Sequence, residues 1–202
     1  MVMTKLNSLK RLEHDFPTFT YKTAQQYDLS KYELHELSND GTIYKIDRGV
    51  YIFPGYLLDE FSLLSQRFSR GVFSLISALI IHNLTDEMSL HYDIVFPQGY
   101  HPATGTLKEN NIRARYLSKK YYSLGITTKK TENASTVRVY SVERTLLDVW
   151  ESNEIEPYVK NEALKRYLST EVNATQIKSL NKLKDELYPS STLLKTLEVY
   201  SQ

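Results

Sequence analysis

The sequence of 202 residues contains no cysteine. The lack of thiols excludes disulfide bridges, thiolate catalysis and cysteine-ligated zinc sites, so nothing in the chain requires an oxidising compartment. Long apolar runs are also missing, since the longest one, Leu75 to Ile81, is interrupted by Ser77 and is far too short to span a bilayer. No apolar region follows a basic start, as it does in export signals. We therefore expect a cytoplasmic protein with no membrane partner.

Motifs of several enzyme classes are absent too. There is no glycine-rich phosphate loop, no P-loop and no nucleophile elbow. The nearest approach to a metal site is the set His82, Asp86, His91 and Asp93, whose spacing matches no ligand motif. His82 ends an apolar segment and suits a core or capping position. We expect no catalytic residue, metal or cofactor, and a metal-dependent nuclease at these four residues is kept only as an alternative.

The charge of the chain is close to balanced, with a formal net charge of +1. Any affinity for nucleic acid must therefore come from local patches of charge. A hydrophobic content of 41% in 202 residues supports a real core, in one large domain or two small ones. The most informative segment for function runs from Thr20 to Phe53.

This segment has the pattern of two helices followed by a hairpin. A helix from Ser30 to Asp40 is predicted, because Ser30 and Glu33 have capping-box spacing and Gly41 suits a helix end. Residues 20–27 favour a preceding helix, and Asp28-Leu29 has the length of a helix-turn-helix connection. Residues 42–46 and 50–53 are β-branched and aromatic around a turn at Asp47-Arg48-Gly49. With a leading helix over residues 4–13, the pattern predicts a winged helix-turn-helix.

The predicted second helix has two different faces. Leu34 and Leu37 lie on one side, and polar and aromatic residues lie on the other. In a DNA reader the polar side would enter the major groove, where Asn39 suits adenine and Lys31 suits guanine, while Lys45 and Arg48 would meet phosphate or the minor groove. The candidate DNA-binding residues are Thr20, Lys22, Ser30, Lys31, Tyr32, His35, Asn39, Lys45 and Arg48.

An alternative is that the same module serves only protein contact or dimerisation, because a fold does not fix a function. Residues 1–55 hold seven basic and seven acidic side chains, so this region has no basic excess of its own.

The pattern along the chain predicts an α+β protein with two domains, residues 1–55 and 56–202. After a helix over 56–68 and a buried helix over 72–82, strands are expected over 90–96, 112–117, 125–131 and 137–140, which should form a small mixed sheet. Helices are then expected over 142–150, 156–168, 175–187 and 191–200.

A second basic segment lies between residues 104 and 138, with eight basic and two acidic side chains. Its basic residues are Lys108, Arg113, Arg115, Lys119, Lys120, Lys129, Lys130 and Arg138. Tyrosines at 116, 121 and 122 are interleaved, so the segment is a candidate to hold a nucleic-acid backbone while rings stack. A solvated face without a partner is the alternative. Residues 143–162 are acidic, and the two regions have the charges to pair within the domain or between copies.

Three short motifs occur in order along the chain. They are Arg48-Gly49-Val50-Tyr51, then Ser77-Ala78-Leu79 with His82-Asn83-Leu84-Thr85-Asp86, and finally Glu143-Arg144-Thr145-Leu146-Leu147-Asp148. Together they resemble the AbiEi antitoxins of bacterial abortive-infection systems, over nearly the whole chain. Asn83 departs from the glycine expected there, and Val142 from proline. Asparagine tolerates the left-handed end of a helix, so the first change is compatible with the resemblance.

The resemblance implies a transcriptional autorepressor that binds double-stranded DNA at inverted repeats in its own promoter, with two copies pairing on the DNA. It also implies an antitoxin domain that counters a nucleotidyltransferase-like toxin, without the need for a stable complex, in phage defence. The alternative is a module that binds the toxin or its RNA substrate, with incidental DNA binding. In the last motif, Arg144 and Asp148 are four residues apart on one helix, so we predict a structural ion pair, with a direct role in antitoxicity as the alternative.

Overall fold

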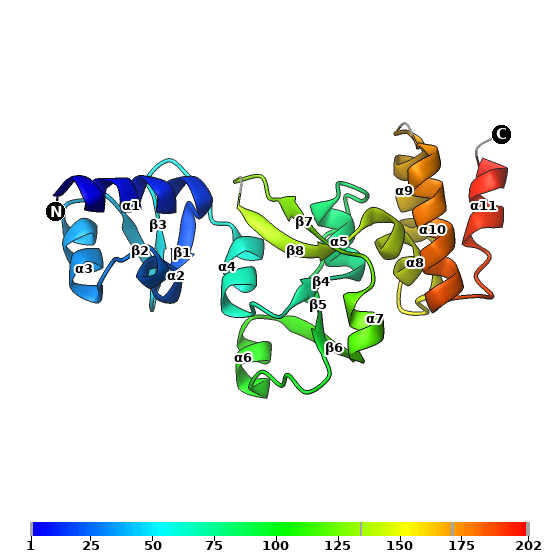
Figure 1. The fold of residues 1–202 in the computed structure, drawn as a ribbon, viewed down its shortest axis with the longest axis horizontal. Coiled ribbons are helices and arrows are strands. Elements are labelled where there is room, and N and C mark those ends of the chain that lie inside the picture. Colours follow the sequence, from blue (N-terminus) through cyan, green and yellow to red (C-terminus); the bar gives the residue numbers. More distant parts are fainter. Residues whose placement is uncertain (1, 134, 171, 201–202) are drawn as a thin grey trace. The chain divides into compact units, whose positions relative to one another are not determined.

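The computed structural model describes residues 2–133, 135–170 and 172–200, and the chain divides into two compact units (Figure 1). The first unit comprises Met1–Ser69 and Lys129–Val137, and the second comprises Arg70–Thr128 and Arg138–Gln202. Helices and small sheets are mixed throughout, so the predicted α+β class is confirmed. Among the described residues, every helix is too short or too polar to cross a membrane.

The first unit alternates short helices and strands. Its elements are α1 (Val2–Asp15), β1 (Thr18–Thr20), α2 (Tyr21–Gln26), α3 (Lys31–Asn39), β2 (Tyr44–Asp47), β3 (Val50–Ile52) and α4 (Glu60–Arg67). The strands form a sheet in the order β1-β3-β2, with both pairs antiparallel. The predicted helices and hairpin are present at the expected places. Strand β1 was not predicted, because three residues carry too little periodicity to be recognised.

Aromatic and aliphatic side chains fill the core of this unit. Leu12, Leu34 and Ile43 are fully buried around Phe19. The Phe19 ring stacks on Tyr51 with centroids 5.6 Å apart. The core therefore joins α1, α3 and the sheet into one small body.

Helix α4 belongs to this unit because the side-chain amide of Gln66 forms four hydrogen bonds, three of them to residues of β1 and α2. Its Oε1 accepts from the Thr20 backbone N–H (2.9 Å) and from the Thr23 hydroxyl (2.6 Å). Its Nε2 donates to the Thr18 carbonyl (2.8 Å) and to the Ser62 hydroxyl (3.1 Å). The compact unit therefore extends past the expected boundary at residue 55, which the apolar pattern alone did not reveal.

The second unit contains a five-stranded sheet with helices around it. Its strands are β4 (Val72–Phe73), β5 (Tyr92–Pro97), β6 (Ile112–Leu117), β7 (Ile126–Lys130) and β8 (Thr136–Tyr140), and the ends of β7 and β8 lie in the first unit. The order is β6-β5-β4-β8-β7. Strand β4 pairs antiparallel with β5 and parallel with β8, and β5 pairs parallel with β6, so the sheet is mixed as predicted.

Two predicted helices were wrong in part, and the first of them, expected over residues 56–68, begins only at Glu60. Residues 72–82 begin as strand β4 and continue as α5 (Leu75–Ile81). The break lies at Leu75, which has a positive φ of 44°. The segment is almost wholly buried, so its apolar pattern has no period that distinguishes strand from helix. The short helices α6 (Thr104–Glu109) and α7 (Lys119–Ser123) were not predicted either.

The C-terminal part of the chain is helical, as predicted. It contains α8 (Val142–Glu151), α9 (Pro157–Leu168), α10 (Ala174–Leu187) and α11 (Leu193–Tyr200). Pro157 occupies the first turn of α9, where its missing N–H costs nothing. Leu79 of α5 and Leu147 of α8 are fully buried in the core that these helices share.

Gly125 controls how closely β7 approaches α8. Its φ is +75°, and a Cβ atom there would lie 2.8 Å from the Arg144 Cβ.

We expect Gly125→Ala to lower the free energy of unfolding by about 2 kcal/mol, because the substitution adds backbone strain to a steric clash. Urea denaturation measures the change. The control is Gly105→Ala in α6, where nothing lies within 4 Å and alanine favours the helix, so it should be neutral or slightly stabilising. Equal effects would contradict the assigned role.

Candidate nucleic-acid interface

Helix α3 has both of the end structures that its sequence predicts. The Ser30 hydroxyl accepts from the Glu33 backbone N–H at 3.3 Å, and the Glu33 carboxylate accepts from the Ser30 backbone N–H at 2.8 Å. Gly41 follows the helix with a φ of +79°. The capping box and the glycine together fix where the helix begins and ends.

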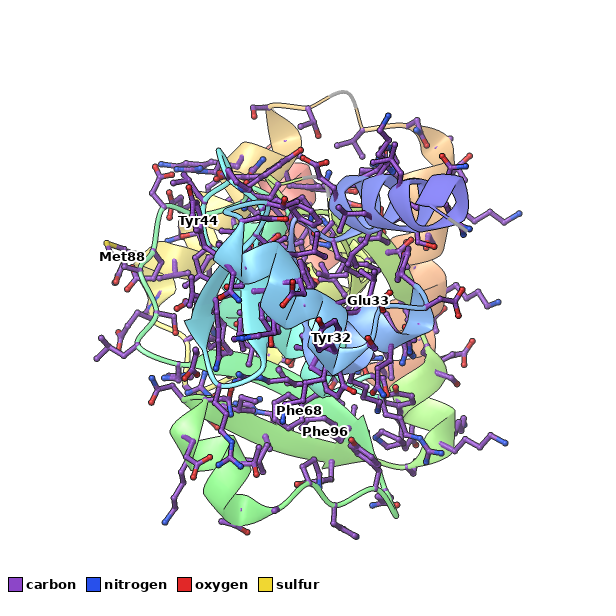
Figure 2. All side chains as sticks on the ribbon, turned by 90° about the vertical axis from the view of Figure 1, so that its left-hand side faces the viewer. Tyr32, Glu33, Tyr44, Phe68, Met88 and Phe96 are labelled. Atoms are coloured by element: carbon purple, nitrogen blue, oxygen red, sulfur yellow. The ribbon has the colours of Figure 1, made fainter. Side chains whose placement is uncertain are left out.

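The two faces of α3 lie as predicted. Leu34 is fully buried, and Leu37 packs against the same core. Tyr32 is 71% exposed and projects from α3 (Figure 2). The other candidates on that face, Lys31, His35 and Asn39, are also exposed. Their acidic neighbour Glu36 is exposed as well. The leucines thus hold the helix, and a polar face with one large ring is left to solvent.

The connection between α2 and α3 is tight. Asp28 has a positive φ of 60°, and the Leu29 backbone N–H donates to the Ala24 carbonyl at 3.1 Å. Leu29 is buried, so this turn is anchored in the core of the unit. Local contacts therefore hold the turn that joins the two helices.

Two predicted contact residues have local structural roles instead. Thr20 is buried, and its hydroxyl accepts from the Thr23 backbone N–H at 3.2 Å to cap α2, so it does not present the predicted surface contact. Ser30 is exposed, but its hydroxyl takes part in the capping box. Lys22, in the first turn of α2, is exposed as a surface contact requires.

The hairpin of β2 and β3 presents its basic residues to solvent. Lys45 and Arg48 are both exposed. The Tyr21 backbone N–H donates to the Gly49 carbonyl at 2.8 Å, which ties the hairpin turn to the start of α2. Tyr44 and Ile46 are exposed as well, at 54% and 45%. Sequence reasoning missed these two, although their spacing of two residues puts them on one face of a strand.

Acidic groups lie among these basic residues. The Thr42 hydroxyl hydrogen-bonds to Asp40 and lowers the pKa of that carboxyl, so Asp40 stays ionised at the end of α3. Asp47 precedes Arg48 in the hairpin turn. Such charges reduce general attraction to phosphate and leave a larger share of the binding energy to direct contacts.

The second basic segment does not form one free patch. Lys129 and Lys130 belong to the first compact unit, and the other six basic residues belong to the second. Arg113 donates to Asp93 at 2.6 Å, and Arg115 donates to Glu154 at 2.7 Å. Arg138 contacts the Tyr122 hydroxyl at 3.1 Å. Lys108, Lys119 and Lys120 are exposed in the second unit. The Arg115–Glu154 pair confirms that the basic and acidic regions meet within the domain.

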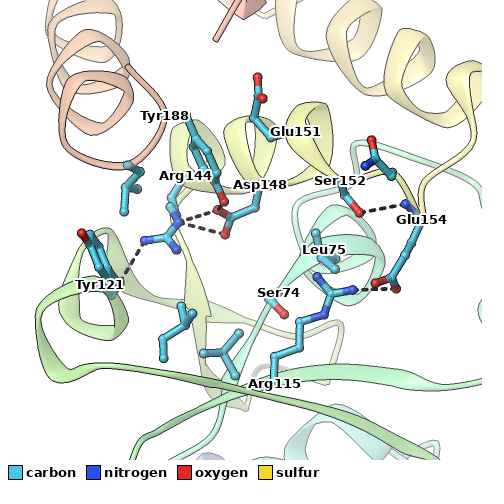
Figure 3. Close-up of a pocket in the computed structure, with 14 residues that line it drawn as sticks. Ser74, Leu75, Arg115, Tyr121, Arg144, Asp148, Glu151, Ser152, Glu154 and Tyr188 are labelled. Atoms are coloured by element: carbon cyan, nitrogen blue, oxygen red, sulfur yellow. Dashed lines mark hydrogen bonds and ion pairs between the residues drawn. The ribbon is translucent and has the colours of Figure 1, made fainter. Parts of the chain in front are cut away.

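The ion pair predicted in the third motif is present and buried (Figure 3). Arg144 Nε donates to both carboxylate oxygens of Asp148 at 2.8 Å. Its Nη1 donates to the carbonyls of Tyr121 and Leu124, each at 3.1 Å, and the Tyr188 hydroxyl donates to Asp148 at 2.7 Å. Burial raises the pKa of Asp148, and the Arg144 charge opposes that shift. These contacts support the structural role that we predicted.

Three of the four residues considered for a metal have other partners, and the fourth, His91, has its Nε2 3.8 Å from Asp93 Oδ1 without a hydrogen bond among the described residues. His82 caps α5, and its Nε2 lies 2.7 Å from the Tyr140 carbonyl oxygen. Asp86 pairs with Arg166, and Asp93 pairs with Arg113. Within the described ranges, no three histidines or carboxylates gather as metal ligands would.

Asn83 follows α5 in the left-handed conformation, with a φ of 59°. The position is the one that commonly carries glycine at the end of a helix, and asparagine is the side chain that tolerates it best. The departure from glycine therefore leaves the local structure intact.

Comparison with known proteins defines the fold alone. Neither a protein-family model nor a curated protein matches the chain. Among solved structures, the crystal structure of the RV2827C protein from Mycobacterium tuberculosis is similar, with a TM-score of 0.50 and 12% sequence identity. The match covers 91% of this chain and 71% of that chain. The likeness supports a shared mixed α+β architecture.

We predict that Asp148→Asn lowers the free energy of unfolding by about 3 kcal/mol, because it leaves the buried Arg144 charge without its counterion. Chemical denaturation measures the loss. Asp185→Asn is the control, since that carboxylate is 72% exposed in its pair with Lys184 and should contribute less than about 0.5 kcal/mol. The double variant Arg144→Met with Asp148→Leu should lose less than Asp148→Asn. If Asp148→Asn loses no more stability than Asp185→Asn, the buried charge of Arg144 does not need its counterion and our account is wrong.

Proposed function

We propose that the protein is a sequence-specific DNA-binding transcriptional repressor whose N-terminal unit is a winged helix-turn-helix. The observation that carries this proposal is the exposed polar face of α3, on a helix that is capped at Ser30 and anchored at Leu34. A rigid helix with an exposed ring and amide suits insertion into a major groove.

The order of elements supports the assignment. Helix α1 and strand β1 precede the helix pair α2 and α3, and the β2–β3 hairpin follows them. In this arrangement α3 is the recognition helix, and the hairpin is a wing beside it. The bond between Tyr21 and Gly49 joins the wing to the helix pair.

Each exposed side chain then has a distinct role. Asn39 reads adenine, and Lys31 reads guanine, through base edges in the major groove. Tyr32 and His35 contact bases or the thymine methyl group from the same face. Lys45 and Arg48 contact phosphate or the minor groove, as Lys22 does from α2, which positions the protein without reading sequence.

The resemblance to AbiEi antitoxins adds a cellular role to the proposal. On that basis the protein represses its own promoter by binding inverted repeats with two copies, and its C-terminal region counters a nucleotidyltransferase-like toxin. Both roles place it in the cytoplasm with the DNA. A nucleotidyltransferase-like protein encoded beside this gene would support the system, and its neutralisation in co-expression would test it.

The first prediction from this proposal concerns the operator. Purified protein should shift a labelled duplex from its own upstream region, and the observed affinity should fall steeply as salt rises, because bound phosphates release counterions. Fluorescence anisotropy at several salt concentrations measures the slope. A scrambled duplex of equal length is the control. Absent or salt-insensitive binding would reject DNA recognition, and tight co-purification with the toxin instead would favour the protein-interaction alternative.

The second prediction separates reading from positioning. Asn39→Ala should weaken binding to the operator by about 1 to 3 kcal/mol and leave scrambled DNA unaffected, because it removes a base contact. Lys45→Ala should weaken both duplexes alike and make the salt slope shallower. Lys182→Ala, an exposed lysine of α10, is the matched control and should change neither. Equal losses of specificity from Asn39→Ala and Lys45→Ala would contradict these roles.

A further inference from the structure

The second unit contains a pocket of about 440 Å³, a volume within the range of small-molecule sites (Figure 3). Residues from the start of α5, from β5, β6, α7 and α8, and from the end of α10 line it. Val95, Leu117 and Leu187 supply apolar surface, and Tyr121 and Tyr188 supply rings. The pocket belongs to the second compact unit, whereas α3 belongs to the first.

The inner wall carries hydrogen-bond donors without acceptors. The Ser74 hydroxyl is buried, with the residue 2% exposed, and among the described residues it has no hydrogen-bond partner. Arg144 uses Nε and Nη1 for protein contacts, but its Nη2 makes no hydrogen bond to the described residues. A buried hydroxyl without a partner costs free energy, so a ligand acceptor at this point would stabilise the structure.

The charges of the lining exclude a simple anion site. Two arginines, Arg115 and Arg144, lie with three carboxylates, Asp148, Glu151 and Glu154. Both arginines are already paired, so the lining offers N–H donors and carboxylate acceptors with little net positive field. A neutral planar group that carries both acceptors and donors matches this lining better than a bare phosphate or carboxylate.

Positive charge is found instead beside the pocket, on α7. Lys119 and Lys120 are exposed on that helix, next to Tyr121, and the Lys120 ammonium lies 5.4 Å from the Tyr121 ring centroid. In Figure 3, Tyr121 lies across the pocket from Glu154. A phosphate on the α7 side would therefore meet lysines and would be distant from that carboxylate.

We propose that this pocket binds a nucleotide, with the base inside and the phosphate on the α7 side. The Ser74 hydroxyl and Arg144 Nη2 donate to acceptors on the base edge, and the Tyr121 ring stacks on its face. Lys119 and Lys120 hold the phosphate. Either a free mononucleotide or an unpaired base of a single-stranded RNA presents this chemistry, since unpaired bases are bound by aromatic rings and arginine in the same way.

The test uses the full chain and two kinds of probe. Isothermal titration calorimetry measures binding of the four ribonucleoside monophosphates, the four nucleosides and inorganic phosphate. Fluorescence anisotropy measures binding of labelled single-stranded RNA hexamers. We expect saturable binding of the nucleotide of at least one base, with a higher affinity than the nucleoside of that base has. If RNA binds more tightly than the monophosphate, the ligand of the pocket is single-stranded RNA. If the monophosphate binds more tightly, the ligand is a free nucleotide.

Variants distinguish binding in the pocket from binding elsewhere on the surface. Tyr121→Ala should weaken binding about tenfold through loss of stacking, and its backbone carbonyl still accepts from Arg144. Ser74→Ala should weaken it roughly fivefold. The double variant Lys119→Ala with Lys120→Ala should reduce the affinity of a nucleotide to near that of its nucleoside. Tyr158→Ala, an exposed tyrosine outside the pocket, is the control and should have no effect.

Three results would overturn the proposal. They are the absence of saturable binding to any nucleotide or RNA at millimolar concentration, inorganic phosphate binding as tightly as the nucleotides, and Tyr121→Ala behaving like Tyr158→Ala. Because Tyr121 is an exposed side chain, the last comparison remains valid even if Ser74→Ala fails to fold. Retention of operator binding by Tyr121→Ala would show that the two sites are independent.

Discussion

The buried pairing of Arg144 with Asp148 is the interaction on which the second unit depends. One guanidinium contacts α8 through Asp148, the residues around α7 through two carbonyls, and β8 through the Tyr140 ring, whose centroid lies 4.5 Å away. Asp148 in turn accepts from Tyr188 at the end of α10. Since the pair joins α8 to α7, β8 and the end of α10, a motif of charged residues here serves architecture first. The same geometry leaves one guanidinium nitrogen at the wall of the pocket.

The first unit uses an uncharged group in the same way. The Gln66 amide bonds to both ends of β1 and to the start of α2, with two acceptor and two donor contacts. A carboxylate of the same shape at this position would be unable to donate to the Thr18 carbonyl. Helix α4 thus supports β1 and the start of α2 through Gln66, while Leu34 anchors α3 in the core.

The sequence was most informative where local chemistry decides the structure. Ser30, Glu33 and Gly41 predict the limits of α3 because caps act within a few residues, and the spacing of Arg144 and Asp148 predicts their pair for the same reason. Long-range contacts were not predictable. Nothing near Gln66 in the chain indicates that it reaches Thr18 and Thr20, and nothing near Arg113 indicates Asp93 as its partner. The Ser74 hydroxyl was equally hidden, because the lack of a partner is a property of the folded environment.

The first unit is built from two stretches of chain that are far apart in the sequence. Asn133 donates to the Leu57 carbonyl at 2.6 Å, and the Thr131 hydroxyl donates to Asp59. During synthesis, these partners leave the ribosome only after the strands and helices between residues 70 and 128 have been made. The amino-terminal body is therefore completed late, although its own segment is translated first. Its final closure is linked to the emergence of the middle of the chain, so the order of translation and the order of assembly differ in this protein.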